Sequence, residues 1–242
     1  MTEVHPARLY LIRLGGGDIP SDPPLSMSFG SYLVQMSDGR HVLIDTGLPQ
    51  GWDTSDRMPT IVIDHDIVSA LAGLGLQPDD IDILITTHFD PDHVGMNDAF
   101  SAAEIVAQRA GYEEARAGQP RAAITRDHWD APNLRYRLVE GDTELLPGLT
   151  LISTPGHAPG HQSVLVRLPN AGAVLLAIDA VAQASAFRPD RESAPMDLDA
   201  AEAIRSTIKL LDLVEQEQAA LVVHGHDGAQ WAALKTAPAF YD

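Results

Sequence analysis

Residues 85–95, ITTHFDPDHVG, carry the strongest signal in this sequence, because an apolar run ends there and four potential metal ligands follow. These ligands are His88, Asp90, Asp92 and His93. Imidazole and carboxylate groups bind many divalent metals, and the chain has no cysteine that could supply a thiolate. If the apolar strand continued, the first three would share one face, since side chains alternate along a strand. The pattern can collect ligands for two metals at adjacent sites, with further ligands needed from elsewhere in the chain.

Further candidate ligands stand where other apolar runs end. TPGHAPGH at 154–161 contains His157 and His161, AVLLAIDA at 173–180 contains Asp179, and VVHGHD at 222–227 contains His224 and His226. A carboxylate at the end of an unbroken buried strand is costly unless a metal ion, another cation or several donors meet it. A DPDH tetrapeptide alone is usually a turn with an N-cap aspartate. Because candidate ligands stand in all four of these segments, at 85–95, 154–161, 173–180 and 222–227, their coincidence favours a metal site.

The overall composition bounds the class of protein. The chain has 242 residues and a formal net charge of −18, which repels nucleic acid and anionic membranes and favours a neutral or cationic substrate. Its length and the absence of repeats or linkers predict a single domain over residues 1–242. The N-terminus has only a short apolar patch, and no run approaches a membrane span. We therefore expect a cytoplasmic protein.

The local patterns alternate between strands and helices. A hairpin is predicted around Asp38-Gly39, helices over 66–75, 110–118 and 197–218, and a closing helix in AQWAALKT. Strands mixed with helices predict a layered α/β domain with the helices outside. Residues 48–66 are expected to form a long loop, in which Trp52 and Met58 are candidates for a lid over the substrate.

The landmarks VLIDTG (42–47), THFDPDHVG (87–95), TPGHAPGH (154–161), LLAIDA (175–180) and VVHGHD (222–227) resemble the metallo-β-lactamase superfamily. Within it, the chain is similar to the N-acyl homoserine lactonase-like branch of quorum-quenching lactonases. The resemblance implies a four-layer αββα sandwich with the metal site at one edge of the sheets. It assigns a first metal to His88, Asp90 and His157, a second to Asp92, His93 and His226, and Asp179 as the bridge. Asp45, His161 and His224 are expected to orient these ligands.

The implied activity is hydrolysis of an N-acyl homoserine lactone, or a similar neutral lactone or ester, by a hydroxide that bridges two divalent metals. Asp92 would pass the proton to the leaving alkoxide. Zinc is the expected metal. The family pattern is H-x-H-x-D-H, however, and Asp90 replaces its second histidine, which favours the harder metals iron or manganese as alternatives. Ala182 stands where the best-known lactonases have a substrate-contacting tyrosine, which leaves the acyl chain open.

Two other functions remain open on the sequence. One is a thioester hydrolase resembling glyoxalase II, against which the acidic charge and the single lysine of the C-terminal ALKTAPAFYD argue. The other is a non-hydrolytic diiron redox or sensor protein, which Asp90 favours. Iron content and spectra that respond to oxygen would distinguish the latter. Members of the family are commonly dimers, and the acidic surface does not forbid a homodimer, so the sequence leaves the oligomeric state open.

Overall fold

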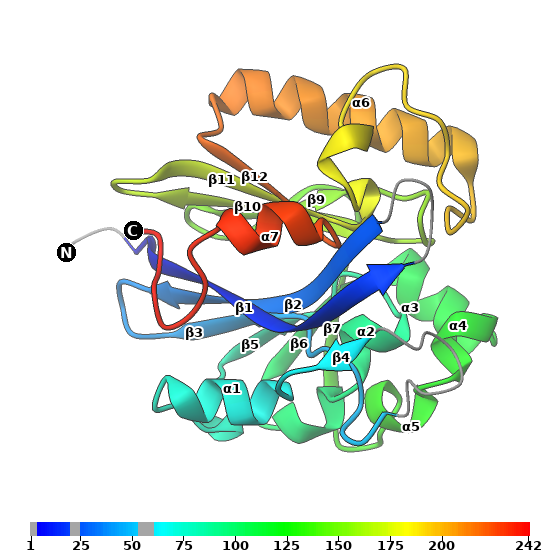
Figure 1. The fold of residues 1–242 in the computed structure, drawn as a ribbon. Coiled ribbons are helices and arrows are strands. Elements are labelled where there is room, and N and C mark those ends of the chain that lie inside the picture. Colours follow the sequence, from blue (N-terminus) through cyan, green and yellow to red (C-terminus); the bar gives the residue numbers. More distant parts are fainter. Residues whose placement is uncertain (1–3, 20–24, 53–60) are drawn as a thin grey trace.

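Two β-sheets pack face to face between outer layers of helices (Figure 1). The computed structural model describes residues 4–19, 25–52 and 61–242. In this part of the chain, all strands of the first sheet precede all strands of the second. Figure 1 places α6 over the outside of the second sheet and α1 over the outside of the first. The predicted αββα sandwich is confirmed.

The first sheet is seven-stranded, with β1 (Pro6–Ile19), β2 (Leu25–Met36), β3 (His41–Ile44), β4 (Val62–Ile63), β5 (Ile83–Ile85), β6 (Glu104–Gln108) and β7 (Arg135–Val139) in the order β4-β1-β2-β3-β5-β6-β7. The second is five-stranded, with β8 (Thr143–Leu146), β9 (Leu149–Ser153), β10 (Gln162–Leu168), β11 (Gly172–Ile178) and β12 (Leu221–His224) in the order β12-β11-β10-β9-β8.

The α-helices are α1 (Ile67–Gly73), α2 (Pro91–Val94), α3 (Arg109–Arg116), α4 (Pro120–Ala123), α5 (Arg126–Trp129), α6 (Ala200–Glu217) and α7 (Gly228–Ala233). Short 3₁₀-helices are η1 (Pro78–Asp80), η2 (Asn97–Phe100), η3 (Asp179–Val181) and η4 (Ala184–Ala186). Among the described residues, no helix combines the length and the apolar character that crossing a bilayer would require.

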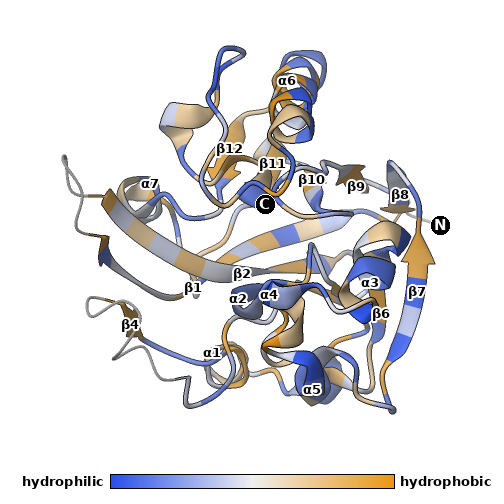
Figure 2. Ribbon diagram, turned by 90° about the vertical axis from the view of Figure 1, so that its right-hand side faces the viewer, coloured by the Kyte–Doolittle hydropathy of each residue, from blue (hydrophilic) through white to orange (hydrophobic). Residues whose placement is uncertain are grey.

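The central strands are apolar on both faces because each face is covered. In β11, Val174 and Leu176 pack in the core between the sheets, whereas Leu175 and Ala177 pack outward in a cluster that includes Leu210 of α6. Alternate side chains of a strand point to opposite faces, so a strand covered on both sides reads as a continuous apolar run. Figure 2 shows this distribution, with hydrophobic colour on the inner strands and hydrophilic colour on much of α3 and α5.

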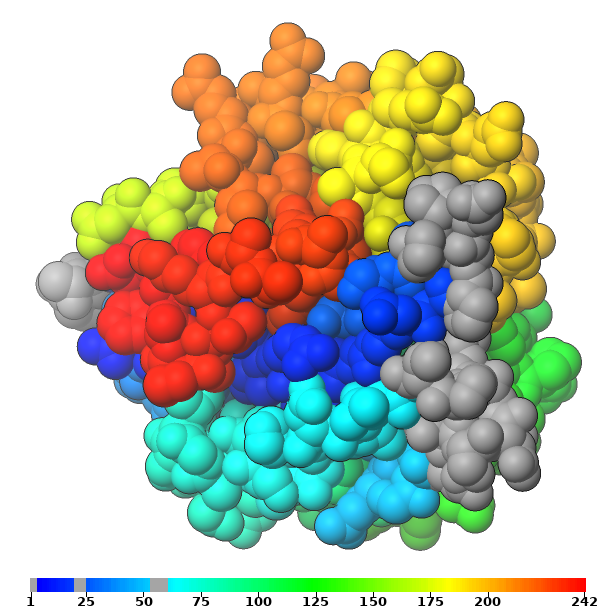
Figure 3. Space-filling model, in the orientation of Figure 1, coloured from blue at the N-terminus to red at the C-terminus, as the bar shows by residue number. Residues whose placement is uncertain are grey.

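The structure differs from the sequence prediction mainly at the N-terminus. The 14-residue β1 was not predicted; its glycines Gly15 to Gly17 interrupt the apolar pattern, yet they pair with β2. A Cβ at Gly15 would lie 2.4 Å from the carbonyl oxygen of Val62, so the glycine permits β4 to pair there. The C-terminal segment also lies against β1 (Figure 3). Leu9 and Tyr241 exchange backbone hydrogen bonds there.

Parallel pairing determines where the site lies. β3 and β5 are parallel neighbours in one sheet, and β11 and β12 are parallel neighbours in the other. Within each pair the carboxyl ends lie side by side, and the packing of the two sheets brings both pairs of ends together at one edge of the sandwich, where His93 and His226 meet Asp179. Asp45 follows β3, the acidic-histidine corner follows β5, Asp179 follows β11 and His226 follows β12.

Candidate metal centre

The corner after β5 is not an extended strand, which corrects one step of the sequence argument. β5 ends at Ile85, and α2 begins at Pro91, so His88 and Asp90 lie in a loop and Asp92 and His93 lie in a helical turn. Asp90 stands at the N-cap of α2, but its carboxylate makes no capping hydrogen bond. Its carboxylate is turned to the cluster instead, so the alternative of a simple capped turn does not apply.

Three imidazoles of the cluster are oriented by hydrogen bonds at their Nδ1 atoms. The Nδ1 atom of His93 donates to the Asp45 carboxylate at 2.7 Å, and that of His226 donates to the carbonyl oxygen of Ser28 at 2.9 Å. The Thr87 hydroxyl donates to Asp45, so it accepts from Nδ1 of His88 at 3.1 Å. Acceptors at Nδ1 fix the tautomer that leaves the Nε2 lone pair free for a metal.

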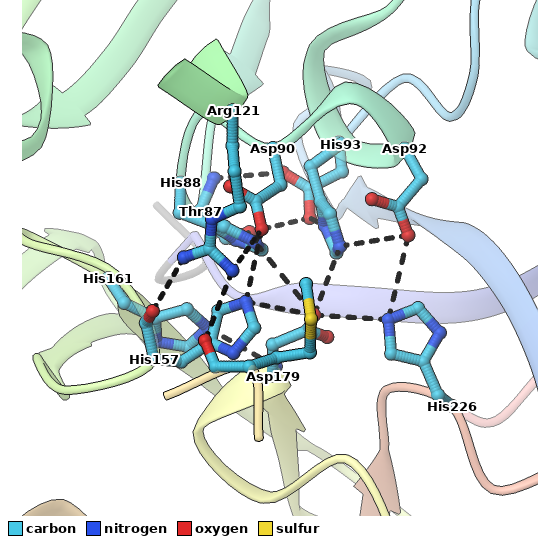
Figure 4. A network of polar contacts seen from close by, with 12 residues as sticks. Thr87, His88, Asp90, Asp92, His93, Arg121, His157, His161, Asp179 and His226 are labelled. Carbon is cyan, nitrogen blue, oxygen red and sulfur yellow. Dashed lines mark hydrogen bonds and ion pairs between the residues drawn. The ribbon is translucent and has the colours of Figure 1, made fainter. Parts of the chain in front are cut away.

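The Nε2 atoms converge on one carboxylate oxygen (Figure 4). Asp179 Oδ2 lies 3.0 Å from Nε2 of His226, 3.5 Å from that of His157, 3.6 Å from that of His93 and 3.8 Å from that of His88. Asp90 Oδ2 lies 3.2 Å from Nε2 of His157, and Asp92 Oδ2 lies 3.6 Å from Nε2 of both His93 and His226. All seven residues predicted as ligands are thus brought together.

The cluster fits two divalent metal ions. Three sets of ligand atoms lie close enough to share an ion: His88 with Asp90 and His157, Asp92 with His93 and His226, and His88 with His93 and Asp179. Nε2 of His88, Nε2 of His93 and Oδ1 of Asp179 are buried and have no hydrogen-bond partner. Buried polar atoms without partners are costly, so their convergence indicates a place built for cations.

Asp45 is fully buried, and its carboxylate accepts hydrogen bonds from both ends of the corner, at Thr87 and at His93. Besides His93 and the Thr87 hydroxyl, it accepts the backbone N–H of Thr87 at 2.8 Å. Its backbone has a φ of 60°, and Ile178, directly before Asp179, has a φ of 52°. Positive φ is costly for residues other than glycine, above all for β-branched isoleucine. The expected contact of Asp45 with a ligand histidine is present, and strained backbone flanks the site on both sheets.

Gly225 allows the last strand to reach the cluster. A Cβ at this position would lie 2.5 Å from Oδ1 of Asp179 and 2.8 Å from the carbonyl oxygen of Ile178. The glycine before His226 therefore permits the close approach of this segment to Asp179.

His161 and His224 lie close to the site in different ways. Nε2 of His161 accepts the backbone N–H of Asp179 at 3.2 Å, while its Nδ1 meets the Thr154 hydroxyl at 2.9 Å. Burial lowers the pKa of His161 well below its usual value, which keeps the ring neutral for this acceptor role. His224 bonds the carbonyl oxygen of Val181 at 3.0 Å, two residues beyond Asp179. It braces the turn after the carboxylate and not a ligand side chain.

Two residues at the cluster escaped the sequence analysis. Arg121 of α4 lies 3.1 Å from Oδ2 of Asp90, and Asp197 lies 3.9 Å from Nδ1 of His157. Asp197 was expected to begin the helix at 197–218, but Asp199 caps α6 and Asp197 is buried against Arg191 instead. The sequence around Arg121, GQPRAA at 118–123, reads as an ordinary turn before a helix. Only tertiary packing brings these residues to the ligands.

The loop after β3 reaches the corner. Thr46 N donates to the carbonyl oxygen of His93 at 2.8 Å, and Gly95 packs against Pro49. Trp52 is half-buried at the end of this described segment, and Met58 lies outside the described residues. The carbonyl oxygen of Ala182 accepts the backbone N–H of His226 at 2.9 Å, so the position without a tyrosine still adjoins a ligand.

The carboxylates also set the charge of the imidazoles in the metal-free protein. Burial opposes protonation of His226, but the neighbouring Asp179 raises its pKa to about 9. Burial likewise opposes protonation of His93, and Asp92, Asp179 and Asp45 raise its pKa well above the usual value. Metal binding must displace these protons, because only a deprotonated imidazole ligates.

We expect the metal-free protein to lose stability as the pH rises. The folded-state pKa of His226 is raised from 6.5 to about 9, so its contribution is complete below pH 6.5 and disappears as the pH passes about 9. The free energy of unfolding should fall by about 3 kcal/mol over this window. Denaturant unfolding with a chelator present measures it. His226→Gln should flatten the profile; an unchanged slope in this variant would contradict the assignment.

Comparison with known proteins shows to which family this chain belongs. The family model described as "Metallo-beta-lactamase superfamily" matches residues 31–226. An N-acyl homoserine lactonase of Bacillus cereus is 34% identical over 227 residues, covering 89% of this chain and 88% of that protein. The crystal structure of a quorum-quenching N-acyl homoserine lactone hydrolase has a TM-score of 0.88 at 29% identity, over 99% of this chain and 100% of that one. A structure of an N-acyl homoserine lactone hydrolase with the product N-hexanoyl-L-homoserine bound at the catalytic metal center has a TM-score of 0.85 at 28% identity, over 98% of this chain and 100% of that one.

Proposed function

Because this chain belongs to the N-acyl homoserine lactonase branch of the metallo-β-lactamase superfamily, we propose that it hydrolyses N-acyl homoserine lactones or closely related neutral lactones. The observation that carries the proposal is the convergence of four Nε2 atoms on Asp179, at the edge where both sheets end. The relatives favour this activity over the thioester hydrolase and the diiron protein that the sequence left open.

His88, Asp90 and His157 would hold one metal, Asp92, His93 and His226 the other, and Asp179 would bridge them. When bound, two divalent ions lower the pKa of a shared water and polarise the lactone carbonyl. We propose zinc as the metal, since four of the seven ligands are imidazoles, which zinc binds well. Elemental analysis of protein produced with zinc, iron and manganese in equal supply would test this choice.

Asp92 is the proposed proton carrier. Its side chain is 28% exposed, whereas those of the other six predicted ligands are 12% exposed or less, so Asp92 faces the substrate side. Its carboxylate would take a proton from the attacking water and pass it to the ring oxygen as the ester bond breaks. The products are the open hydroxyl chain and a new carboxylate, with net release of one proton.

The substrate class follows from charge and the loop after β3. A net charge of −18 disfavours anionic substrates, which agrees with a neutral lactone.

Trp52, in the loop that also contacts the corner, is proposed to line the path of the acyl chain. We expect Trp52→Ala to raise KM for long acyl chains about tenfold relative to short ones, since it removes a large apolar contact. KM across a series of chain lengths measures this; equal changes for all lengths would remove the proposed role.

The deciding experiment follows proton release by the zinc-loaded protein with homoserine lactones of several chain lengths and with thioesters. Turnover of lactones that a chelator abolishes, and that zinc restores, is the expected result. Turnover of thioesters alone would overturn the proposal. A protein that binds two metals yet leaves every substrate intact would also overturn it, in favour of a non-hydrolytic role.

A further inference from the structure

Asp90 is held by a cation from another part of the chain. Arg121 Nη1 lies 3.1 Å from Oδ2 of Asp90, and the carboxylate side chain is 9% exposed. Among the described residues, Arg121 is the only lysine or arginine in an ion pair with any of the seven predicted ligands. In Figure 4 its guanidinium lies beside Asp90 and above His157.

The guanidinium is fixed by further contacts. Nη2 donates to the carbonyl oxygen of His157 at 2.7 Å, and Nη1 donates to that of Met196 at 3.1 Å. Arg121 therefore joins the loop of Asp90, the loop of His157 and the segment before α6. The first two of these loops carry all three residues assigned to one metal, because His88 lies in the same loop as Asp90. A planar guanidinium can make such divergent contacts at once, whereas a lysine ammonium cannot reproduce them.

Both members of the pair stand on the same aromatic cluster. Trp129 Nε1 donates to the carbonyl oxygen of Ala122, next to Arg121, at 2.8 Å. Phe89, next to Asp90, packs on Trp129 with ring centroids 5.1 Å apart. The two backbones are thus tied to one buried side chain, which makes the pair a built feature and not a surface contact.

The charges explain why a cation is needed here. Asp90, Asp92 and Asp179 place three negative charges among the seven ligands. A site with H-x-H-x-D-H at the corner and the same bridging aspartate would carry two, because Asp90 replaces a neutral histidine. Arg121 adds one positive charge directly on the extra carboxylate and restores the net charge of that pattern. A paired carboxylate also donates less charge to a metal, which brings Asp90 closer to the imidazole it replaces.

We propose that Arg121 is a positioning residue that balances the charge of Asp90 and thereby sets the affinity of one of the two metal sites. The proposal rests on the ligand assignment of the proposed function. It predicts that Arg121 raises zinc affinity through Asp90, and that this effect on affinity is smaller when a histidine stands at position 90.

The test is a double-mutant cycle on zinc binding. Wild type, Arg121→Gln, Asp90→His and the double variant are stripped of metal and titrated with zinc against a chromophoric chelator. We expect Arg121→Gln to weaken one of the two zinc equivalents about 10–100-fold, the usual effect of losing a partner of a ligand. In the Asp90→His background the same substitution should change it less than about threefold.

Two variants guard the interpretation. Arg126→Gln removes a nearby arginine that pairs with Asp130, and zinc affinity should not change. Arg121→Lys keeps the charge and should recover part of the affinity. Thermal unfolding in chelator confirms that each variant is folded.

Wild-type zinc affinity in Arg121→Gln would overturn the proposal. An equal loss in both backgrounds would do so too, since it would assign the effect to the bonds with the carbonyl oxygens of His157 and Met196 and not to Asp90. Failure of lactone hydrolysis with normal zinc binding would refute the proposed function alone.

Discussion

Asp179→Ala is expected to remove bound metal and to lower lactone turnover by at least about 10³-fold. Asp179 is the proposed bridging ligand, and losing a ligand should cost more than losing a residue that only orients one, which costs about 10–100-fold. Asp179 Oδ2 is the atom on which four imidazoles converge, at 3.0–3.8 Å. Without it, the imidazoles of both proposed metal sites lose their shared partner. Elemental analysis after dialysis and kcat on a homoserine lactone measure the two effects.

His224→Ala is the matched control, since this buried histidine follows β12 but bonds the carbonyl oxygen of Val181 and not a ligand. It should retain both metals and lose less than about tenfold in activity, below the usual range for a residue that orients a ligand. Equal losses in the two variants would show that the carboxyl end of β12 contributes a different ligand from His226.

Asp45→Ala should have the second largest effect of these substitutions. It should lower both the stability of the fold and the affinity for metal. The carboxylate is fully buried and accepts from His93, from the Thr87 hydroxyl and from the Thr87 backbone N–H. Removing a buried charged partner of this kind costs about 3–5 kcal/mol, because the donors stay buried and unpaired. We expect a fall in Tm of about 10 °C, at roughly 2–4 °C per kcal/mol for a chain of this size.

The conservative variant Asp45→Asn separates the contribution of Asp45 to stability from its role in orienting His93. Asp45→Asn can still accept from Thr87, but its amide group would face the Nδ1–H of His93 with another donor. Metal affinity should therefore fall about 10–100-fold even where stability recovers. Asp38→Asn, in the exposed turn beside Arg40, serves as the control and should leave both unchanged. Normal metal affinity in Asp45→Asn would contradict the role of Asp45 in orienting His93.

Local sequence patterns predicted much of the fold. Leu175 and Ala177 alternate with Val174 and Leu176, and both pairs are apolar because β11 is buried on both faces. The predicted hairpin around Asp38-Gly39 and the helix now seen as α6 are present for the same reason: short-range periodicity and turn residues specify them. β1 was missed because Gly15 to Gly17 stabilise a sheet only through pairing partners that are distant in sequence.

The sequence by itself determined which residues gather at the site, because histidines and aspartates that end apolar runs have few other uses in a buried core. The tertiary structure alone decided how they are held. His88 and Asp90 lie in a loop and not on one strand face, His93 depends on Asp45, and Arg121 meets Asp90 from a helix 31 residues further along the chain. Ion pairs and hydrogen bonds between distant segments leave no periodic trace in a single sequence, so these supports became visible only when the carboxyl ends of the strands met.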